Sequence, residues 1–244
     1  MKQNKTTRKN KEASGVGKTI KSKFQEERTN PSPLKPLNEK QAEYIKLLRN
    51  KPMVIATGYA GTSKTYIPTV MACDEFRAGN INKIYLTRPN ISNSKSLGYF
   101  GGSLEEKCMN WLGPVLSILN DRIGVGAVEV AIRNKDIEFV PFEVIKGWSF
   151  SKAWVICDEA EDITVEEAKK IVTRMGKDSK LCLAGDITQS ELKERSGLSK
   201  LIEMVDKNDS LQSKVGVIDF NRASDIVRSD LCREWILAFN RESN

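Results

Sequence analysis

The sequence of 244 residues contains no histidine. This excludes Ser-His-Asp triads, Cys-His pairs and His-ligated metals, so any catalysis must use carboxylates, lysine, arginine, hydroxyls or a bound ion. The five cysteines lie far apart without a C-x-x-C pair, which argues against a zinc site or a disulfide framework and fits a reducing cytoplasm. No apolar run reaches 18 residues, and the basic N-terminus lacks an apolar segment. We therefore expect a cytoplasmic protein with neither a transmembrane helix nor a secretory signal.

The excess positive charge is confined to the N-terminus. Residues 1–36 hold ten Lys/Arg and three Asp/Glu, a net charge of +7 that equals the charge of the whole chain. This segment has few apolar residues and ends on PSPLKP, so it cannot bury enough apolar surface to offset the entropy cost of ordering. We predict a disordered basic arm, with a short helix at 19–27. The arm either binds nucleic acid through phosphates or serves as a solubilising tail.

Strand-like and helix-like segments alternate in residues 37–244. Apolar, β-rich runs predict strands at 53–57, 83–87, 137–141, 153–157, 180–184 and 214–219. Helical spacing of apolar residues predicts helices at 39–48, 64–77, 104–119, 165–174, 197–205 and 226–239. Such alternation is typical of an α/β domain with a mostly parallel sheet flanked by helices. We predict one such domain over 37–244.

Two stretches resemble the phosphate-binding loop G-x-x-x-x-G-K-[ST]. EASGVGKT at 12–19 lacks the first glycine, and GYAGTSKT at 58–65 has Ser63 in place of the last one. A phosphate loop needs a buried strand before it and a helix after it, so that backbone N–H groups and the positive end of the helix dipole point at the phosphates. PMVIAT and KTYIPTVMACDEF supply these flanks to the second stretch alone. We predict that 58–65 binds nucleotide phosphates and that 12–19 is a chance match.

The residues of this loop have distinct expected roles. Lys64 would reach the β- and γ-phosphates, and Thr65 would ligate Mg²⁺. Gly58 and Gly61 let the backbone approach the phosphates closely. Ser63 adds a Cβ at a cost of roughly 1–2 kcal/mol, or its hydroxyl binds a phosphate oxygen. The predicted ATP-binding residues of this region are Gly58, Tyr59, Ala60, Gly61, Thr62, Ser63, Lys64, Thr65 and Tyr66.

Two more strand-like runs end in polar residues. AWVIC is followed by Asp158, a predicted Mg²⁺ ligand, and by Glu159, which would orient and deprotonate the attacking water; alternatively, both acids cap the next helix. LCLA leads to Asp186 and Gln189, and Gln189 is placed to sense the γ-phosphate or the water, unless Gly185 and Asp186 only form a turn. Because ligands lie beyond the carboxyl ends of parallel strands, we expect three strands to bring these groups to one edge.

With these motifs the chain resembles the PhoH family of ATPases, whose core is similar to the first RecA-like domain of superfamily 1 helicases. The matching segments are PLNEKQ at 36–41, GYAGTSKT at 58–65, TRP at 87–89, LGYFGGSLEEK at 97–107, VICDEAE at 155–161, TRMG at 173–176 and GDITQ at 185–189. The resemblance covers about residues 36–239. It implies that Gln41 reads the adenine edge, and that the 180–184 strand lies between the 53–57 and 153–157 strands.

Three departures from the family pattern stand out. Ser63 replaces the last glycine of the loop, Glu161 stands where glutamine is usual, and IKGWS at 145–149 replaces an arginine-glycine-arginine-threonine-like segment. The first departure bears on nucleotide affinity and turnover. The third bears on nucleic-acid contact.

The resemblance to helicases also implies partners. Arg88 in the TRP turn, and Lys146 and Trp148 in the KGW turn, follow strands near the expected active edge. Lys146 would contact a phosphate of RNA or single-stranded DNA, and Trp148 would stack on a base. A core tryptophan and a solvated lysine are the alternative.

A helicase motor closes ATP between two RecA-like domains, whereas this chain has room for one. An arginine that acts on the γ-phosphate is therefore expected from the far end of the chain or from a neighbouring subunit. Arg174, Arg222 and Arg228 are the candidates, with surface ion pairing as the alternative role. We accordingly expect a ring-like homo-oligomer, a hexamer, with ATP at its interfaces.

Together these features predict an ATP-binding, Mg²⁺-dependent ATPase coupled to RNA or single-stranded DNA. The alternative is a nucleotide-regulated nucleic-acid-binding protein in which Ser63 slows or blocks hydrolysis. A nuclease is less favoured, because the acids other than Asp158, Glu159 and Asp186 form no evident two-metal cluster.

Overall fold

The computed structural model describes residues 32–89, 113–192 and 195–242, and the described residues from Leu34 onward group into one compact unit. The basic arm at 1–31, the LGYFGGSLEEK segment and the expected helix start at residue 104 lie outside the described residues.

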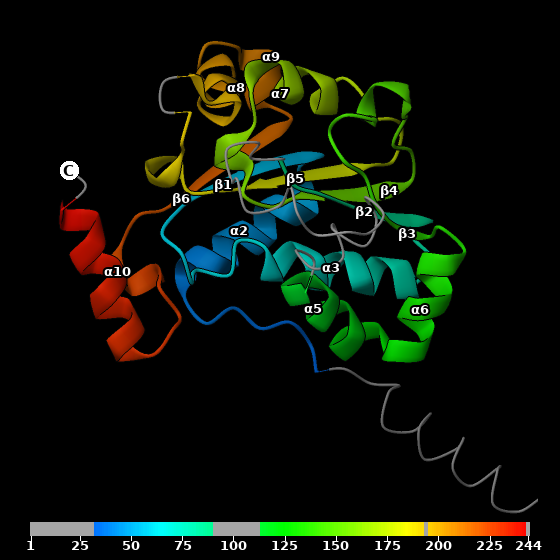
Figure 1. Cartoon of the computed structure of the whole chain (residues 1–244), viewed down its shortest axis with the longest axis horizontal. Helices are drawn as coiled ribbons and strands as arrows, with labels where there is room; N and C mark the ends of the chain where they lie inside the picture. Colours follow the sequence, from blue (N-terminus) through cyan, green and yellow to red (C-terminus); the bar gives the residue numbers. More distant parts are fainter. Residues whose placement is uncertain (1–31, 90–112, 193–194, 243–244) are drawn as a thin grey trace, which may run out of the picture. The chain divides into compact units, whose positions relative to one another are not determined.

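Six parallel strands form one sheet in the order β3-β2-β4-β5-β1-β6 (Figure 1). The strands are β1 (Met53–Gly58), β2 (Lys83–Thr87), β3 (Ile137–Phe139), β4 (Ala153–Cys157), β5 (Lys180–Ala184) and β6 (Val215–Phe220). All five residues of β4 are buried, as expected for an apolar run covered on both faces, whereas β6 has exposed positions at the sheet edge. The structure confirms the α/β class, and it places β5 between β1 and β4 as the resemblance implied.

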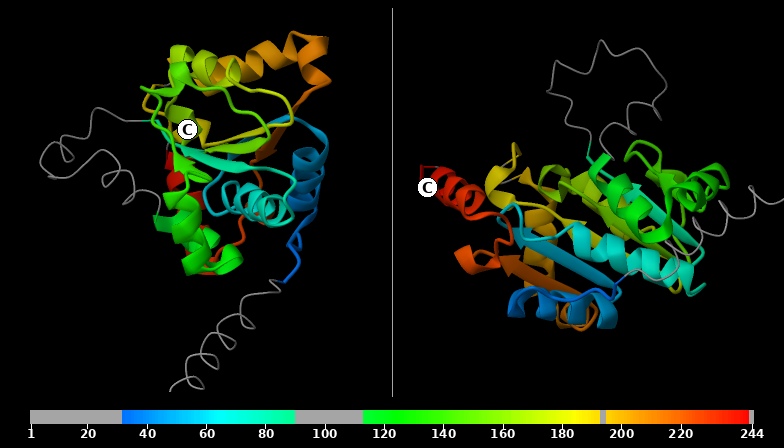
Figure 2. Two further views of the ribbon diagram at one scale, coloured as in Figure 1. Left: turned by 90° about the vertical axis from the view of Figure 1, so that its right-hand side faces the viewer. Right: turned by 90° about the horizontal axis from the view of Figure 1, so that it is seen from below.

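Helices cover both faces of the sheet. α2 (Glu39–Asn50), α3 (Tyr66–Arg77), α5 (Gly113–Ile123) and α6 (Val125–Arg133) lie on one face, and α7 (Val165–Val172), α8 (Gly197–Asp206) and α9 (Asp209–Gln212) lie on the other (Figures 1 and 2). Tyr44 and Trp154 belong to the apolar cluster on the first face, and Phe142 and Phe150 belong to the cluster on the second. No helix within the described ranges has the length and apolar content needed to span a bilayer.

Several boundaries differ from the sequence-based expectation. The helix expected from residue 64 begins at Tyr66, because the two preceding residues complete the loop. The last helix, α10 (Asp230–Glu242), begins four residues later than expected, since Val227 N–H donates to the carbonyl of Gly61 at 3.0 Å and ties this segment to the loop. α6 was not predicted, and Gly124 separates it from α5 with a φ of 98°.

α2 is capped at its first turn and bonded to the sheet at its last turn. The side chain of Asn38 accepts a hydrogen bond from the backbone N–H of Gln41 at 2.8 Å and caps the first turn. At the other end the Lys180 ammonium donates to the carbonyls of Leu48 and Arg49 at 2.6 and 2.9 Å, where the helix dipole favours a positive charge. The bonds from Lys180 thus hold the last turn of α2 against β5.

Candidate functional site

A cavity of about 650 Å³ opens at the carboxyl edge of the sheet, beyond the ends of β1, β4 and β5. Loop residues from Ala60 to Thr65 line it, and so do Asp158, Glu159, Asp186 and Gln189. All strands run parallel, so their carboxyl ends meet at this edge, where ligands of such sheets bind. The three motifs that the sequence predicted separately thus border one space.

The loop at 58–65 depends on backbone conformations that favour glycine. Gly58 has a φ of 103° and Gly61 a φ of 74°. A Cβ on Gly58 would lie 2.3 Å from the carbonyl oxygen of Phe220, and one on Gly61 would lie 2.6 Å from Cγ of Arg228. Neither position has room for a side chain, and the close approach of both glycines to the phosphates stays a prediction.

Ser63 adopts the left-handed conformation that the missing glycine would take freely. Its φ is 72°, which costs a residue with a Cβ about 1–2 kcal/mol. The Nε2 group of Gln41 donates to the Ser63 hydroxyl at 3.4 Å and so compensates only weakly. The departure from the loop pattern therefore leaves the loop backbone in place, at a cost in stability.

Lys64 folds back over its own loop. The Nζ atom donates to the carbonyls of Gly58 and Tyr59 at 2.5 and 2.6 Å. Burial lowers the pKa of the Lys64 ammonium, while nearby carboxylates, first Asp186 and then Glu161, act to raise it. The ammonium thus lies inside the loop, close to the acids that follow β4 and β5.

Thr65 and Asp158 join two separate strands. The Thr65 hydroxyl, at the start of α3, donates to the Asp158 carboxylate at 2.5 Å just after β4. Burial raises the pKa of Asp158, and the hydrogen bond from Thr65 opposes that shift. One hydroxyl and one carboxylate beside a phosphate loop form the donor set that Mg²⁺ takes, with waters and phosphate oxygens as further ligands, so these residues fit the ion.

Glu159 lies between a cation and a second acid. Its backbone is left-handed, with a φ of 51°, and its Oε1 lies 3.5 Å from Nη2 of Arg88. On the other side it shares a hydrogen bond with the buried Glu161, whose Oε2 also accepts the backbone N–H of Asp186 at 3.1 Å. Burial, followed by this hydrogen bond, raises the pKa of Glu161 to about 8.

A protonated Glu161 explains the second departure from the family pattern. With a pKa of about 8, Glu161 keeps its proton at neutral pH. A protonated carboxyl has an O–H donor on one oxygen and an acceptor on the other, so it can replace the carbonyl oxygen and one N–H donor of a glutamine amide at the same place. Glutamate can therefore stand where glutamine is usual without leaving a buried charge.

Asp186 aims Gln189 at the cavity. Its Oδ1 accepts from the backbone N–H and the hydroxyl of Thr188 at 3.1 and 2.7 Å, and its Oδ2 accepts from Nε2 of Gln189 at 2.7 Å. These bonds shape the short 3-10 turn η3 (Ile187–Gln189) after β5. The turn role of Asp186 and the site role of Gln189 are thus compatible.

Gln41 is buried against the loop and does not line the cavity. Its Oε1 accepts the N–H of Leu37 at 2.9 Å, and its Nε2 also lies 3.4 Å from the carbonyl of Thr62. The adenine contact of Gln41 stays a prediction. Tyr44, one turn further along α2, was not predicted, yet its hydroxyl donates to the carbonyl of Lys64 at 2.8 Å.

The three candidate arginines occupy different places. Arg228 lines the cavity of its own chain and packs over Gly61. Arg222 is exposed beside the short turn η5 (Ala223–Asp225) and does not line the cavity. The carbonyl of Arg174 accepts from Phe150 N–H at 2.8 Å before β4 begins, so Arg174 lies near the opposite edge of the sheet.

The three candidate nucleic-acid contacts also lie in different surroundings. Arg88 follows β2 at the carboxyl edge and faces Glu159. Lys146 is exposed in the turn η1 (Ile145–Gly147). Trp148 is half-buried and packs edge-on against Tyr85, with ring centroids 5.4 Å apart, which favours its core role.

One wall of the cavity consists of residues that were not among the predicted site residues. Pro114, Val115 and Ile118 of α5 reach it, and so do Leu37 and Val227. Apart from Leu37, which lies in the PLNEKQ segment, these residues match no motif. The α5 residues and Val227 reach the cavity through the packing of α5 on α3 and of the 226–229 segment on the loop. Helical spacing alone carries no signal for such a contact.

We predict that Glu161→Gln removes part of the pH dependence of stability. A carboxyl whose pKa is about 8 in the folded state and near 4.5 when unfolded binds its proton only in the folded state between these values, so stability is lost as pH rises from about 5 to 8. Urea unfolding between pH 5 and 8 should show a free-energy loss smaller in the variant by on the order of 2–4 kcal/mol. The exposed Glu166→Gln is the control, and equal slopes in parent and Glu161→Gln would contradict the assignment.

The chain is similar to a known protein family and to several known proteins. The family described as PhoH-like protein matches residues 33–240. Protein PhoH of Escherichia coli strain K12 is 32% identical over 213 residues, which cover 86% of this chain and 59% of that protein. A PhoH-like protein of Bacillus subtilis strain 168 is 33% identical over 205 residues, which cover 83% and 63%.

The chain spans about three-fifths of the length of these relatives. Among solved structures, the large terminase from a thermophilic bacteriophage is similar at a TM-score of 0.49 and 13% identity, over 82% of this chain and 50% of that one. A likeness at that level supports no argument about function. The family match and the relatives' identities, over most of this sequence, show that the chain belongs to the PhoH-like family.

Proposed function

We propose that this chain binds ATP with Mg²⁺ and hydrolyses it at the carboxyl edge of the sheet. The observation that carries the proposal is the hydrogen bond of 2.5 Å from Thr65 to Asp158, because it joins a phosphate loop to an acid from another strand. This is the pair that holds Mg²⁺ in P-loop ATPases. The adjoining cavity, about 650 Å³, has a volume typical of a small-molecule site. Membership of the PhoH-like family supports the same reading.

In this proposal the loop at 58–65, with Lys64, binds the phosphates. Backbone N–H groups of residues 58–65 and the positive end of α3 bind phosphate oxygens. Lys64 exchanges the carbonyls of Gly58 and Tyr59 for oxygens of the β- and γ-phosphates, since a charged oxygen is a stronger partner for an ammonium. Mg²⁺, when bound at Thr65 and Asp158, neutralises the charge that develops on the phosphates.

The acids and the amide act on the attacking water. Glu159 takes the proton of the water, and Gln189, held by Asp186, orients the water for attack on the γ-phosphorus, while the bond from that phosphorus to the β–γ bridging oxygen breaks and ADP leaves. Arg228 lies on the cavity in its own chain, which makes it the best placed of the three arginines to stabilise transferred charge without a second subunit.

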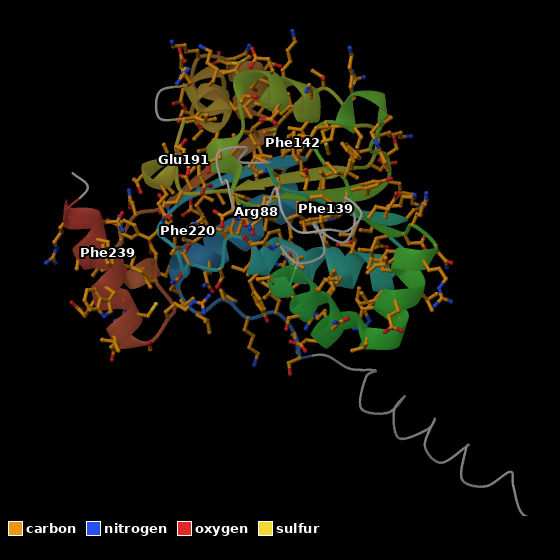
Figure 3. All side chains as sticks on the ribbon, viewed as in Figure 1. Arg88, Phe139, Phe142, Glu191, Phe220 and Phe239 are labelled. Atoms are coloured by element: carbon orange, nitrogen blue, oxygen red, sulfur yellow. The ribbon has the colours of Figure 1, made fainter. Side chains whose placement is uncertain are left out.

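Coupling to RNA or single-stranded DNA and assembly into a ring belong to the proposal as well. Partly exposed Arg88 at the active edge supports nucleic-acid contact. α10 supports assembly, because Leu231, Trp235 and Phe239 recur every four residues and are 72%, 59% and 63% exposed. Figure 1 shows α10 at the β6 end of the sheet, apart from both helical layers, and Figure 3 labels Phe239 on it.

The alternative function, a nucleotide-regulated nucleic-acid-binding protein with little hydrolysis, has two observations in its favour. Ser63 strains the loop, and Lys64 is already bonded to loop carbonyls. Both features raise the cost of reshaping the loop around a triphosphate. Turnover in the parent protein separates the two functions.

We predict Mg²⁺-dependent ATP hydrolysis by the full chain. Glu159→Gln should lower kcat about 10²- to 10⁴-fold with ATP binding retained, because it removes the base and leaves the loop intact. Lys64→Ala should weaken ATP binding and turnover together. The measurements are steady-state phosphate release and equilibrium ATP binding.

Two results would decide against this assignment. ATP binding without turnover in the parent, even when RNA is added, would favour the alternative function, and Ser63→Gly would then test whether loop strain is the cause. Failure of both the parent and Glu159→Gln to bind ATP would remove the site assignment.

We further predict that the apolar stripe of α10 holds the oligomer together. Trp235→Asp should convert an assembly of the full chain into monomers, because a carboxylate would have to be buried at the interface. Sedimentation of both proteins measures the effect. Val130→Asp, at a position on α6 with similar exposure, is the control and should leave the assembly intact. A monomeric parent with full ATPase activity would exclude the ring.

A further inference from the structure

We propose that Arg88 is a phosphate sensor for single-stranded nucleic acid that restrains Glu159 until nucleic acid binds. This inference rests on the proposed function and adds the regulation of the same site. It arises from the ion pair between the two residues, in which a cation at the sheet edge occupies the group assigned as the general base.

The pairing of β2 with β4 places the two side chains together. Thr87 lies opposite Cys157 in this pair of neighbouring strands. Arg88 is the first residue after β2, and Glu159 is the second residue after β4. The guanidinium and the carboxylate therefore leave adjacent strand ends, and Nη2 lies 3.5 Å from Oε1. Figure 3 shows Arg88 at the level of the sheet, between the two helical layers.

The Glu159 carboxylate is held by two protein partners. One oxygen faces Arg88, and the side chain also shares a hydrogen bond with Glu161. An oxygen that is held by a guanidinium is not directed at a water beside the γ-phosphate. In this arrangement Glu159 is positioned by its protein partners, and release of the Arg88 contact is the step that frees it for the water in the cavity.

The ion pair between Arg88 and Glu159 is weak enough for another anion to replace Glu159 as the partner of Arg88. The side chains of Arg88 and Glu159 are 32% and 42% exposed, so both can be reached from solvent. Ion pairs with this exposure and a separation of 3.5 Å are weak. A phosphodiester offers a guanidinium two oxygens in a bidentate geometry, which is a stronger contact. A nucleic-acid phosphate that reaches the carboxyl edge therefore competes with Glu159 for Arg88.

A second ion pair on β2 provides a matched comparison. Lys83, at the start of the same strand, pairs with Glu138 at 3.0 Å and lies at the opposite edge of the sheet from the cavity. Neutralising Lys83 removes a positive charge from β2 without touching the site. It therefore separates the effect of the Arg88 contact from the effect of net charge.

The test compares the full-length parent with Arg88→Gln, which keeps a polar side chain and removes the charge. ATP hydrolysis at saturating ATP is measured with and without a single-stranded oligonucleotide, oligo(U) RNA in one arm and oligo(dT) DNA in the other. Without oligonucleotide the variant should have a kcat about 2- to 5-fold above the parent, the range that a weak exposed pair can supply. The oligonucleotide should stimulate the parent and leave the variant unchanged, with the KM for ATP equal in both.

A second measurement needs no hydrolysis. If Glu159 and nucleic acid compete for Arg88, Glu159→Gln should bind the oligonucleotide about 2- to 5-fold more tightly in the absence of ATP, because linkage is reciprocal. Arg88→Gln should bind it several-fold more weakly. Lys83→Gln should match the parent in hydrolysis, apart from a small uniform loss of affinity from its lower charge.

The outcomes that overturn the proposal are distinct from those that overturn the proposed function. A lower kcat in Arg88→Gln without oligonucleotide, or retained stimulation in that variant, would show that Arg88 does not restrain Glu159. So would equal oligonucleotide binding by the parent and Glu159→Gln. Loss of the proposed function has another signature: the parent would hydrolyse no ATP, or Glu159→Gln would hydrolyse it at the parental rate.

Discussion

The hydrogen bond from Thr65 to Asp158 is the contact on which the rest of the site depends. The two residues follow β1 and β4, which are separated in the sheet by β5. The chain leaves β5 at Gly185, where a Cβ would lie 2.3 Å from Oε2 of Glu161. The absence of a side chain at Gly185 therefore leaves room for this buried acid beside the site.

Much of this arrangement is predictable from sequence because it follows from local patterns. Apolar runs define the strands, and flanking elements select GYAGTSKT over EASGVGKT. The carboxyl ends of parallel strands then bring Asp158, Glu159, Asp186 and Gln189 to the loop. The cavity wall from α5 and the position of Arg228 were not predictable as cavity contacts, because both depend on how distant segments pack. The hydroxyl of Tyr44 on the Lys64 carbonyl is a contact of the same kind.

Two of the three departures from the family pattern, Ser63 and Glu161, have physical explanations in the structure. Ser63 keeps the loop conformation and bears the strain of a left-handed backbone. Glu161 is buried and protonated, so it offers the hydrogen bonds of a glutamine. Arg88, a predicted nucleic-acid contact, forms an ion pair with Glu159. These residues connect the proposed hydrolysis to its proposed regulation, since the same carboxylate faces the cavity, the second acid and the cation.

We propose that Thr65 and Asp158 hold Mg²⁺ for a nucleotide on this loop. The most direct measurement is the equilibrium affinity of the full chain for ATP, with Mg²⁺ and with chelator, in the parent and in Thr65→Val, which keeps the shape of the side chain and removes the hydroxyl. We expect Mg²⁺ to strengthen ATP binding to the parent, and we expect most of this gain to be lost in Thr65→Val. An equal gain from Mg²⁺ in both proteins would contradict this proposal.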